Sequence, residues 1–273
     1  MASGESRQPE WPQTEELRSR VGAVRLLAWI AALVAAVPLF GLVDLATTLG
    51  LSDPRYAWAM SLAASWGSLL TFVVAAGFGW VGAVPRRPAP GLGLLGLATL
   101  GLLVGSALLL DARPLGLAVP LGAVTALLAV LLRPYVRPSV PAWRWRPSPP
   151  AIVAALGVPL WAGYVVNTEI AALIAPPGSG DDTVGIDHWP VQLALGVVLA
   201  VGSALLTGAV RQLVLWRWSF GLTAVAVAWA TLAYPDRAGA MPHPVWGVLF
   251  VVWGALLALP SGRRVEMRRS VSG

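Results

Sequence analysis

Long hydrophobic stretches separated by short polar segments dominate this chain. A helix needs about 20 largely apolar residues to cross the hydrocarbon core of a bilayer, and most of the stretches approach or exceed that length. They predict membrane-spanning helices rather than the core of a soluble domain. The weakest is the seventh, which is short and rich in alanine. The eight stretches are Leu26–Val43, Ala57–Val84, Gly91–Leu110, Leu115–Leu132, Ala151–Ala175, Pro190–Val210, Ser219–Tyr234 and Pro244–Leu259.

The fold class predicted from this pattern is all-α, a polytopic integral membrane helical bundle with eight transmembrane helices. Only Asp111-Ala112-Arg113-Pro114 separates the third and fourth stretches. Charged side chains are costly at the centre of a membrane and proline can start a helix, so this segment predicts a tight helical hairpin. The predicted organisation is a cytoplasmic polar tail (1–20), a first four-helix half (21–132), an Arg- and Pro-rich cytoplasmic loop (133–150), a second half (151–262) and a basic cytoplasmic tail (263–273).

Two weak echoes suggest that the halves are parallel repeats. Val37-Pro38-Leu39-Phe40 in the first stretch resembles Val158-Pro159-Leu160-Trp161 in the fifth. Ala98-Thr99-Leu100 in the third resembles Ala230-Thr231-Leu232 in the seventh. The alternative is coincidence, because a small apolar alphabet makes such matches common. Since Pro38 and Pro159 fall at matching depths, we expect both helices to bend alike. The bends would either open a cavity toward the outer leaflet or serve ordinary packing.

The distribution of charge predicts the orientation. All 19 basic residues are arginine, and with the N-terminus inside, only Arg55, Arg113 and Arg237 fall in outer loops. Eight of the 13 acidic residues fall at the outer side. The positive-inside rule then places the protein in the plasma (inner) membrane of a bacterium, with the N-terminus and the C-terminus cytoplasmic. The expected partners are the lipid bilayer and, through the Arg-rich loops, anionic inner-leaflet lipids. A pI near 10.9 also suits nucleic acid, but the topological explanation is better, and we expect no nucleic acid partner.

Composition excludes several kinds of chemistry. The chain has no cysteine, no lysine and two histidines. It can therefore form no disulfide, thiolate nucleophile or Schiff base, and it cannot supply three histidines to zinc. We expect neither a metal nor a cofactor.

Glu169 is the most informative ionisable residue. It lies roughly 9 Å inside the Pro176-Pro177 break at 1.5 Å per residue, where a carboxyl group needs a partner, protonation or a wet cavity. We interpret Glu169 as a ligand-binding or proton-handling acid. The alternative is a neutral or paired acid in helix packing, with Arg113 or Arg237 as its partner.

The outer segment 180–190 is rich in acids. Asp181, Asp182 and Asp187 offer oxygen ligands that suit Ca²⁺, but their spacing does not fit an EF-hand. For His188, Glu169 or Asp236 is a better partner than the adjacent Asp187. An ordinary solvated histidine is the alternative. The predicted ligand-binding residues are Asp44, Asn167, Glu169, Asp187, His188, Trp189, Asp236 and His243.

Gly101 and Gly105 form a small-xxx-small pattern, which allows two helices to approach closely. Packing within the chain is the expected use, and a dimer face is the alternative. Trp66, Trp161, Trp229 and Trp253 fall deep within their stretches, so we expect them to pack between helices.

Three functions remain open. The leading interpretation is a non-enzymatic membrane protein that binds or passes a small molecule, lipid or cation at an acid-rich outer mouth, or that assists a membrane-protein partner. The alternative is an outer-leaflet enzyme using the catalytic candidates Glu169, His188 and Asp236 as acid/base groups on a lipid-like substrate. The third is an assembly subunit without a pocket. Contact between Glu169 and His188 would favour the enzyme, and a sealed core below Glu169 would argue against transport.

Overall fold

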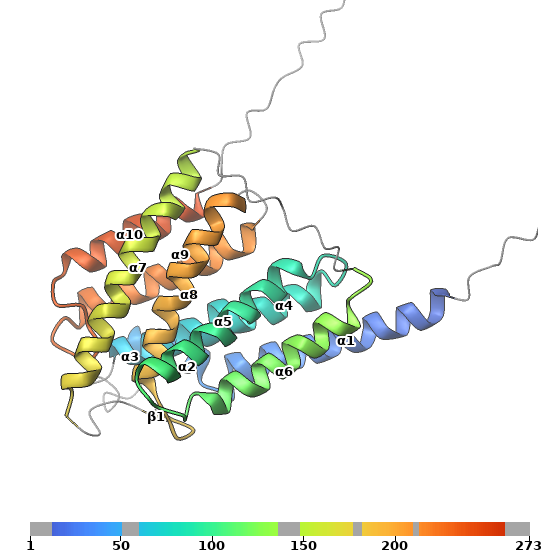
Figure 1. Ribbon diagram of the computed structural model, residues 1–273, viewed down its shortest axis with the longest axis horizontal. Coiled ribbons are helices and arrows are strands. Elements are labelled where there is room, and N and C mark those ends of the chain that lie inside the picture. The colour runs from blue at the N-terminus through green and yellow to red at the C-terminus, as the bar shows by residue number, and fades with distance from the viewer. Residues whose placement is uncertain (1–12, 51–59, 136–147, 177–181, 210–212, 260–273) are drawn as a thin grey trace, which may run out of the picture.

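The computed structural model describes residues 13–50, 60–135, 148–176, 182–209 and 213–259. They form a bundle of helices that lie side by side, with the N-terminal part of α1 projecting beyond the rest (Figure 1). The elements are α1 (Gln13–Ala36), α2 (Gly41–Thr48), α3 (Met60–Ser68), the π-helix η2 (Leu69–Ala75), α4 (Ala76–Ala83), α5 (Ala89–Leu108), α6 (Leu115–Leu131), α7 (Pro149–Ile174), β1 (Asp182–Thr183), β2 (Ile186–Asp187), α8 (His188–Ala209), α9 (Val214–Ala233) and α10 (Val245–Ala258).

Each hydrophobic stretch coincides with helical structure. The first is divided into α1 and α2, and the second is one continuous run of α3, η2 and α4. The predicted tight hairpin is confirmed, because α5 ends at Leu108 and α6 begins at Leu115 directly after Pro114. The all-α prediction is therefore confirmed.

Within the described ranges, five helical runs are long and apolar enough to cross a membrane: Ser19–Thr48, Met60–Ala83, Ala89–Leu108, Pro149–Ile174 and His188–Gly208. They indicate a membrane protein. The remaining three do not reach this standard by length and composition. α6 has 17 residues and α10 has 14, and 14 residues extend only about 21 Å against a hydrocarbon core of about 30 Å. α9 has 20 residues but carries Arg217 in its first turn.

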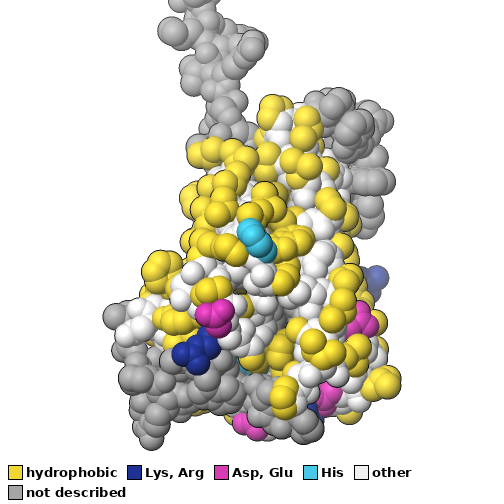
Figure 2. Space-filling view, turned by 90° about the vertical axis from the view of Figure 1, so that its left-hand side faces the viewer, with side chains coloured by type: hydrophobic (Ala, Val, Ile, Leu, Met, Phe, Trp, Pro, Cys, Tyr) yellow, Lys and Arg dark blue, Asp and Glu magenta, His cyan; other side chains and the backbone are white. Residues whose placement is uncertain are grey.

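The surface supports the membrane interpretation. Large apolar side chains are exposed along the long helices, for example Leu33 on α1 (63%) and Leu173 on α7 (72%). Figure 2 shows one face that is largely hydrophobic, with few charged side chains, most of them in its lower half. Soluble monomers rarely expose continuous apolar surface of this extent. Hydrocarbon is the solvent that this surface suits.

Contacts between helix termini define two ends of the bundle. At the first, the indole of Trp216 donates to the Pro90 carbonyl at 2.8 Å and that of Trp253 to the Val153 carbonyl at 2.8 Å. At the second, the Trp229 indole donates to the Thr48 carbonyl at 2.7 Å. Helices of adjacent hydrophobic stretches, such as α5 and α6 or α7 and α8, run in opposite directions (Figure 1).

The described charged side chains separate between these ends. The first, the arginine-rich end, carries Arg20, Arg25, Arg86, Arg87, Arg133 and Arg217. The second, the acidic end, carries Asp44, Asp111, Glu169, Asp182, Asp187 and Asp236, together with Arg113 and Arg237. The separation predicted from the sequence is thus present in the folded chain.

Gly101 and Gly105 pack within the chain, as expected. A Cβ atom on Gly105 would lie 2.3 Å from the Pro190 carbonyl oxygen, and one on Gly101 would lie 2.8 Å from the Ala194 carbonyl oxygen. The absence of side chains lets the backbones of α5 and α8 approach closely.

The two matched prolines behave differently, so the expectation that both helices bend alike is wrong. α1 ends at Ala36, and the chain turns through Pro38 before α2 begins. Pro159 instead lies inside the continuous α7. The difference arises at Phe40, whose φ of 64° is left-handed and cannot continue a helix. The Trp66 indole holds this break by donating to the Leu39 carbonyl at 2.8 Å.

The deep tryptophans mostly pack between helices. Trp66, Trp161 and Trp253 are buried, as predicted. The prediction is wrong for Trp229, which is 48% exposed because its ring lies on the outer face of α9 while its N–H reaches Thr48.

Candidate functional site

A short β-hairpin leads into α8 at the acidic end. Asp182 pairs with Asp187 and Thr183 with Ile186 in an antiparallel ladder. Val184 and Gly185 form the two-residue turn, with φ values of 53° and 77°. Tight hairpins favour positive φ at both central residues because such turns match the twist of the strands. Glycine accepts this backbone easily, whereas the β-branched Val184 is strained.

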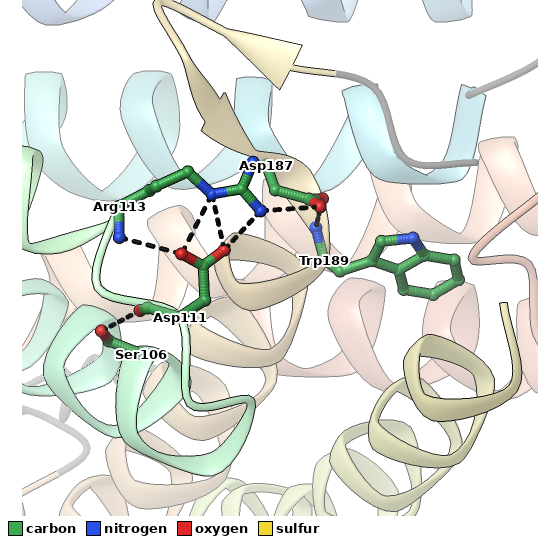
Figure 3. Close-up of polar contacts among 5 residues, drawn as sticks. All are labelled: Ser106, Asp111, Arg113, Asp187 and Trp189. Carbon is green, nitrogen blue, oxygen red and sulfur yellow. Dashed lines mark hydrogen bonds and ion pairs between the residues drawn. The ribbon is translucent and has the colours of Figure 1, made fainter. Parts of the chain in front are cut away.

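An ion-pair cluster ties the hairpin to the α5–α6 connection (Figure 3). The Arg113 guanidinium contacts Asp111 at 2.7 Å and Asp187 at 3.2 Å. Ser106 donates to the Asp111 carbonyl, which fixes the connection to the end of α5. We call Asp111, Arg113 and Asp187 the clasp.

The ion pair between Asp111 and Arg113 perturbs the titration of both groups. Hydrogen bonding to Arg113 lowers the pKa of Asp111 below its usual value of 3.8, and the same hydrogen bond raises the pKa of Arg113. The second carboxyl group has a further role, because Asp187 Oδ1 accepts from the Trp189 backbone N–H at 2.9 Å. This contact caps the N-terminus of α8 and connects the clasp to the next residue, His188.

His188 is buried beneath the hairpin. Its ring stacks on Trp66 with centroids 4.6 Å apart and an interplanar angle of 21°, and only 1% of the residue is exposed. Its Nε2 lies 2.9 Å from the Thr183 hydroxyl. The imidazole is therefore held by the indole on one face and by the hairpin at one nitrogen.

Polar side chains from α3, α7 and α8 gather below this histidine. The Ser65 hydroxyl lies 2.8 Å from the Tyr164 hydroxyl, which joins α3 to α7. Gln192, one turn after His188, donates to the Gly239 carbonyl at 2.7 Å.

Thr168 lies at the same level as Gln192. Gly196 on α8 faces the Tyr164 ring, and α7 and α8 run in opposite directions (Figure 1). Thr168 and Gln192 are each one turn from this contact toward the acidic end. We call Ser65, Tyr164, Thr168, His188 and Gln192 the buried polar cluster; all are at most 1% exposed.

Three atoms of the cluster have no hydrogen-bond partner among the residues that the structure describes. They are His188 Nδ1, Gln192 Oε1 and Thr168 Oγ1. Buried polar atoms are nearly always paired, because an unpaired one loses its water without compensation. These atoms are therefore suited to a bound polar group or to water.

Aromatic side chains close the bundle farther toward the arginine-rich end. Trp161 stacks on Phe250 with centroids 4.6 Å apart and an interplanar angle of 12°. Tyr164 and Trp253 meet the Trp161 ring edge-on. All four are buried. Below the polar cluster the core beside α7 and α10 is thus packed mainly with apolar groups. The Trp253 indole and the Tyr164 hydroxyl are hydrogen-bonded, whereas Trp161 Nε1 and Ser203 Oγ have no partner among the described residues.

The residues singled out from the sequence are distributed over the acidic end. Asp187, His188 and Trp189 form one unit at the start of α8. Asn167 and Glu169 are half-buried on α7, and Asp44 is buried in α2. Asp236 and His243 are exposed in the α9–α10 connection, where His243 Nδ1 accepts from the Val245 backbone N–H at 3.2 Å.

The expected partnerships of these residues are not observed in the described ranges. Arg113 pairs with Asp111 and Asp187 rather than with Glu169. His188 contacts the Thr183 hydroxyl rather than Glu169 or Asp236. Tertiary packing decided both outcomes, because the hairpin brings its own hydroxyl and carboxyl groups to these positions.

Sequence reasoning missed most of the buried polar cluster. Gln192 lies four residues after His188, and Thr168 lies four after Tyr164; this helical spacing on otherwise apolar helices is the signal that was available. For metals, no three His, Asp or Glu side chains cluster within the described part of the chain. Asp181, one of the three acids grouped above, lies outside it.

We compared the chain with models of protein families, with curated proteins and with solved structures, and none of them matches.

Proposed function

We propose that this chain is an eight-span protein of the plasma membrane that binds a small molecule at its acidic end and does not transport it. The arginine-rich end and both termini lie in the cytoplasm in this proposal. The observation that carries the binding function is the set of unpartnered polar atoms in the buried polar cluster.

The separation of charge supports the orientation. Arginines are retained on the cytoplasmic side of membrane proteins, and here they gather at one end of the bundle. Each arginine near the surface contributes about 1 kcal/mol of attraction to anionic lipid. Exposed Arg86, Arg87 and Arg133 are the residues that would contact these lipids. The short helices α6 and α10, and α9 with its Arg217, would then cross with their interfacial ends included.

The polar cluster supports binding rather than catalysis. His188 Nδ1, Gln192 Oε1 and Thr168 Oγ1 are buried polar atoms without a partner among the described residues, and Gln192 Oε1 lies beside Gly239. An acid/base mechanism needs a carboxyl group in contact with the imidazole or one water away. The group that contacts the His188 imidazole is the Thr183 hydroxyl, which is not a carboxyl group, and Asp236 is exposed at the surface. Neither residue meets this requirement.

The closed core supports binding rather than transport. A transported molecule needs a route that continues past the middle of the membrane. Trp161 and Phe250 stack across that level, and Tyr164 and Trp253 close their edges.

Native mass spectrometry of the purified full chain tests the binding function. We expect a small molecule to co-purify with the wild type and to be lost in His188→Leu, which removes the imidazole but retains an apolar side chain. The matched control is His243→Leu, because the other histidine is exposed. A wild type without a bound molecule, or equal retention in both variants, contradicts the proposal.

The natural absence of cysteine gives a direct test of orientation. Val184→Cys places a thiol at the exposed hairpin turn, and Ala89→Cys places one at the exposed start of α5. In intact cells, a membrane-impermeant maleimide should label the first variant, and the second only after the membrane is disrupted. The reverse pattern would invert the proposed topology.

A further inference from the structure

We propose that the ligand is amphipathic: an uncharged, hydrogen-bonding head occupies the buried polar cluster, and one hydrocarbon chain occupies an apolar cavity beside Pro38. This inference rests on the proposed binding function and names the chemical class of the ligand.

The cavity lies between α1, η2, α5 and α6 and measures about 140 Å³. Its walls include Ala35, Leu39, Leu70, Val74 and Leu121, and every residue that lines it is apolar. An apolar cavity of this size stays dry and accepts apolar molecules. Of the molecules available in a bilayer, a hydrocarbon chain suits these walls, and the volume accepts a segment of the chain of about the size of benzene.

Three interruptions of regular helix geometry meet at this cavity. The break after α1 contributes Leu39, the π-helix η2 contributes Leu70 and Val74, and α6 contributes its internal Pro120. π-helical segments and strained backbone often mark functional sites. The left-handed Phe40 adjoins Leu39 at the same break. Regular helices would pack more simply, so this concentration of irregular backbone indicates a site rather than a packing defect.

Trp66 joins the cavity to the polar cluster. One face of its indole stacks on His188, and its N–H donates to the carbonyl of Leu39, a cavity residue. Leu70, another cavity residue, is one turn further along the same helical run, about 6 Å away in rise. The polar and apolar parts are therefore neighbours across a single side chain.

The length of the cavity matches one chain in one leaflet. Along α1 its lining extends from Leu39 to Ala31, eight residues or about 12 Å. Half of a hydrocarbon core of about 30 Å is about 15 Å. The lining runs away from the acidic end, which places the head at that end and the chain toward the membrane centre.

The chemistry of the cluster selects an uncharged head. Its side chains offer hydroxyl, amide and imidazole groups, and the adjacent charges of the clasp already pair with one another. A hydroxyl- or amide-bearing head satisfies the unpartnered atoms without bringing an uncompensated charge into a buried site.

A second apolar groove, between α7 and α10, measures about 420 Å³ and includes Pro159 and Leu256 among its lining residues. No member of the buried polar cluster lines either space, but Leu39 of the first accepts a hydrogen bond from Trp66, which stacks on His188. No residue of the groove accepts such a bond from Trp66, so the groove provides a reference for lipid that contacts the bundle without a head-group site.

Photo-crosslinking of the full chain in phosphatidylcholine nanodiscs tests the inference. The probe is a monoacylglycerol with a 12-carbon chain and a terminal diazirine. The chain length matches the cavity, whose lining extends about 12 Å along α1, when the ester group lies next to the head. Cross-linked peptides are located by mass spectrometry, with and without excess unlabelled glycerol monododecanoate. We expect competitor to abolish labelling of α1 and α6 while labelling in the α7–α10 groove persists.

Matched variants locate the chain and the head. Ala35→Leu adds volume to a cavity wall, and Ala255→Leu makes the same change at an exposed position of α10. The competable labelling should be lost in Ala35→Leu and in His188→Leu and retained in Ala255→Leu. Melting temperatures of the variants confirm that each one is folded.

The outcomes separate the two proposals. Loss in His188→Leu with retention in Ala35→Leu means that the chain lies elsewhere, which overturns this inference and leaves the binding site intact. Retention in His188→Leu means that the head does not occupy the cluster, which also overturns it. If the competitor does not reduce the labelling of α1 and α6, the probe has reached these helices as bulk lipid only and occupies no specific site. In that last case the mass spectrometry of the wild type and His188→Leu still decides the binding function.

Discussion

Gly105→Ala is the most direct test of how the bundle is held together. The added Cβ would lie 2.3 Å from the Pro190 carbonyl oxygen and 3.2 Å from the Ala194 backbone nitrogen. Carbon–oxygen contacts normally begin at about 3.3 Å, so α5 and α8 must separate by roughly 1 Å at this point. Overpacking of this kind costs about 1–3 kcal/mol. We expect the upper part of that range, because backbone atoms cannot rotate away as a side chain can.

Gly96→Ala is the matched control on the same helix. Nothing lies within 4 Å of a Cβ at this exposed position, and replacing a mid-helix glycine by alanine gains about 0.5–1 kcal/mol where no contact is disturbed. The two substitutions should therefore change stability in opposite directions. Reversible unfolding of the purified chain in mixed micelles by increasing sodium dodecyl sulfate, followed by tryptophan fluorescence, measures both.

Two results would refute this reasoning. A Gly105→Ala variant as stable as the wild type would show that α5 and α8 do not approach as closely as the structure has them. A variant with unchanged monomer stability but a weakened dimer would assign the glycine pair to an intermolecular face. Cross-linking in micelles at several protein concentrations distinguishes the second result from the first.

The remaining predictions concern the acidic end. Hydrogen bonding to Arg113 holds the pKa of Asp111 below 3.8. The clasp should therefore stabilise the hairpin at neutral pH and lose that effect as the pH falls below this value. The loss of stability should be at most about 1 kcal/mol, because the Arg113 side chain is 51% exposed. Asp111→Asn should abolish this pH dependence of hairpin amide exchange. Val184→Asn should slow that exchange by relieving strain of about 1 kcal/mol, whereas Val184→Thr, equally β-branched, should not. Tyr164→Phe should cost about 1 kcal/mol, and a double-mutant cycle with Ser65→Ala that gives no coupling energy would contradict the contact between the two hydroxyl groups.

The helical architecture could be predicted from the sequence because it follows from local chemistry. Uncharged stretches of nearly membrane length form helices whatever their neighbours are, since backbone groups in hydrocarbon must be paired within the helix. The α5–α6 hairpin could be predicted for the same reason, from Pro114 and two adjacent charges. The separation of arginines and acids between the two ends also follows from the order of charges along the chain.

The site depended on contacts between residues far apart in the sequence. Glu169 drew attention as an acid inside an apolar stretch, yet the structure gathers its buried polar groups around His188, Trp66 and Tyr164. Nothing local indicates that residue 66 will stack on residue 188, because that depends on how α3 packs against α8. Likewise, Arg113 had several acids within reach, and the hairpin selected Asp187.

The sequence by itself determined which segments are helical and which end carries each charge, because helix formation and the cost of burying charge act over a few neighbouring residues. Only the tertiary structure decided that Pro38 breaks a helix while Pro159 does not, that Gly105 packs against Pro190, and that an apolar cavity lies between α1 and α6. Those features depend on which side chain meets which across the bundle, for instance the Trp66 indole that holds the Leu39 carbonyl, and packing between helices is a property of the whole chain.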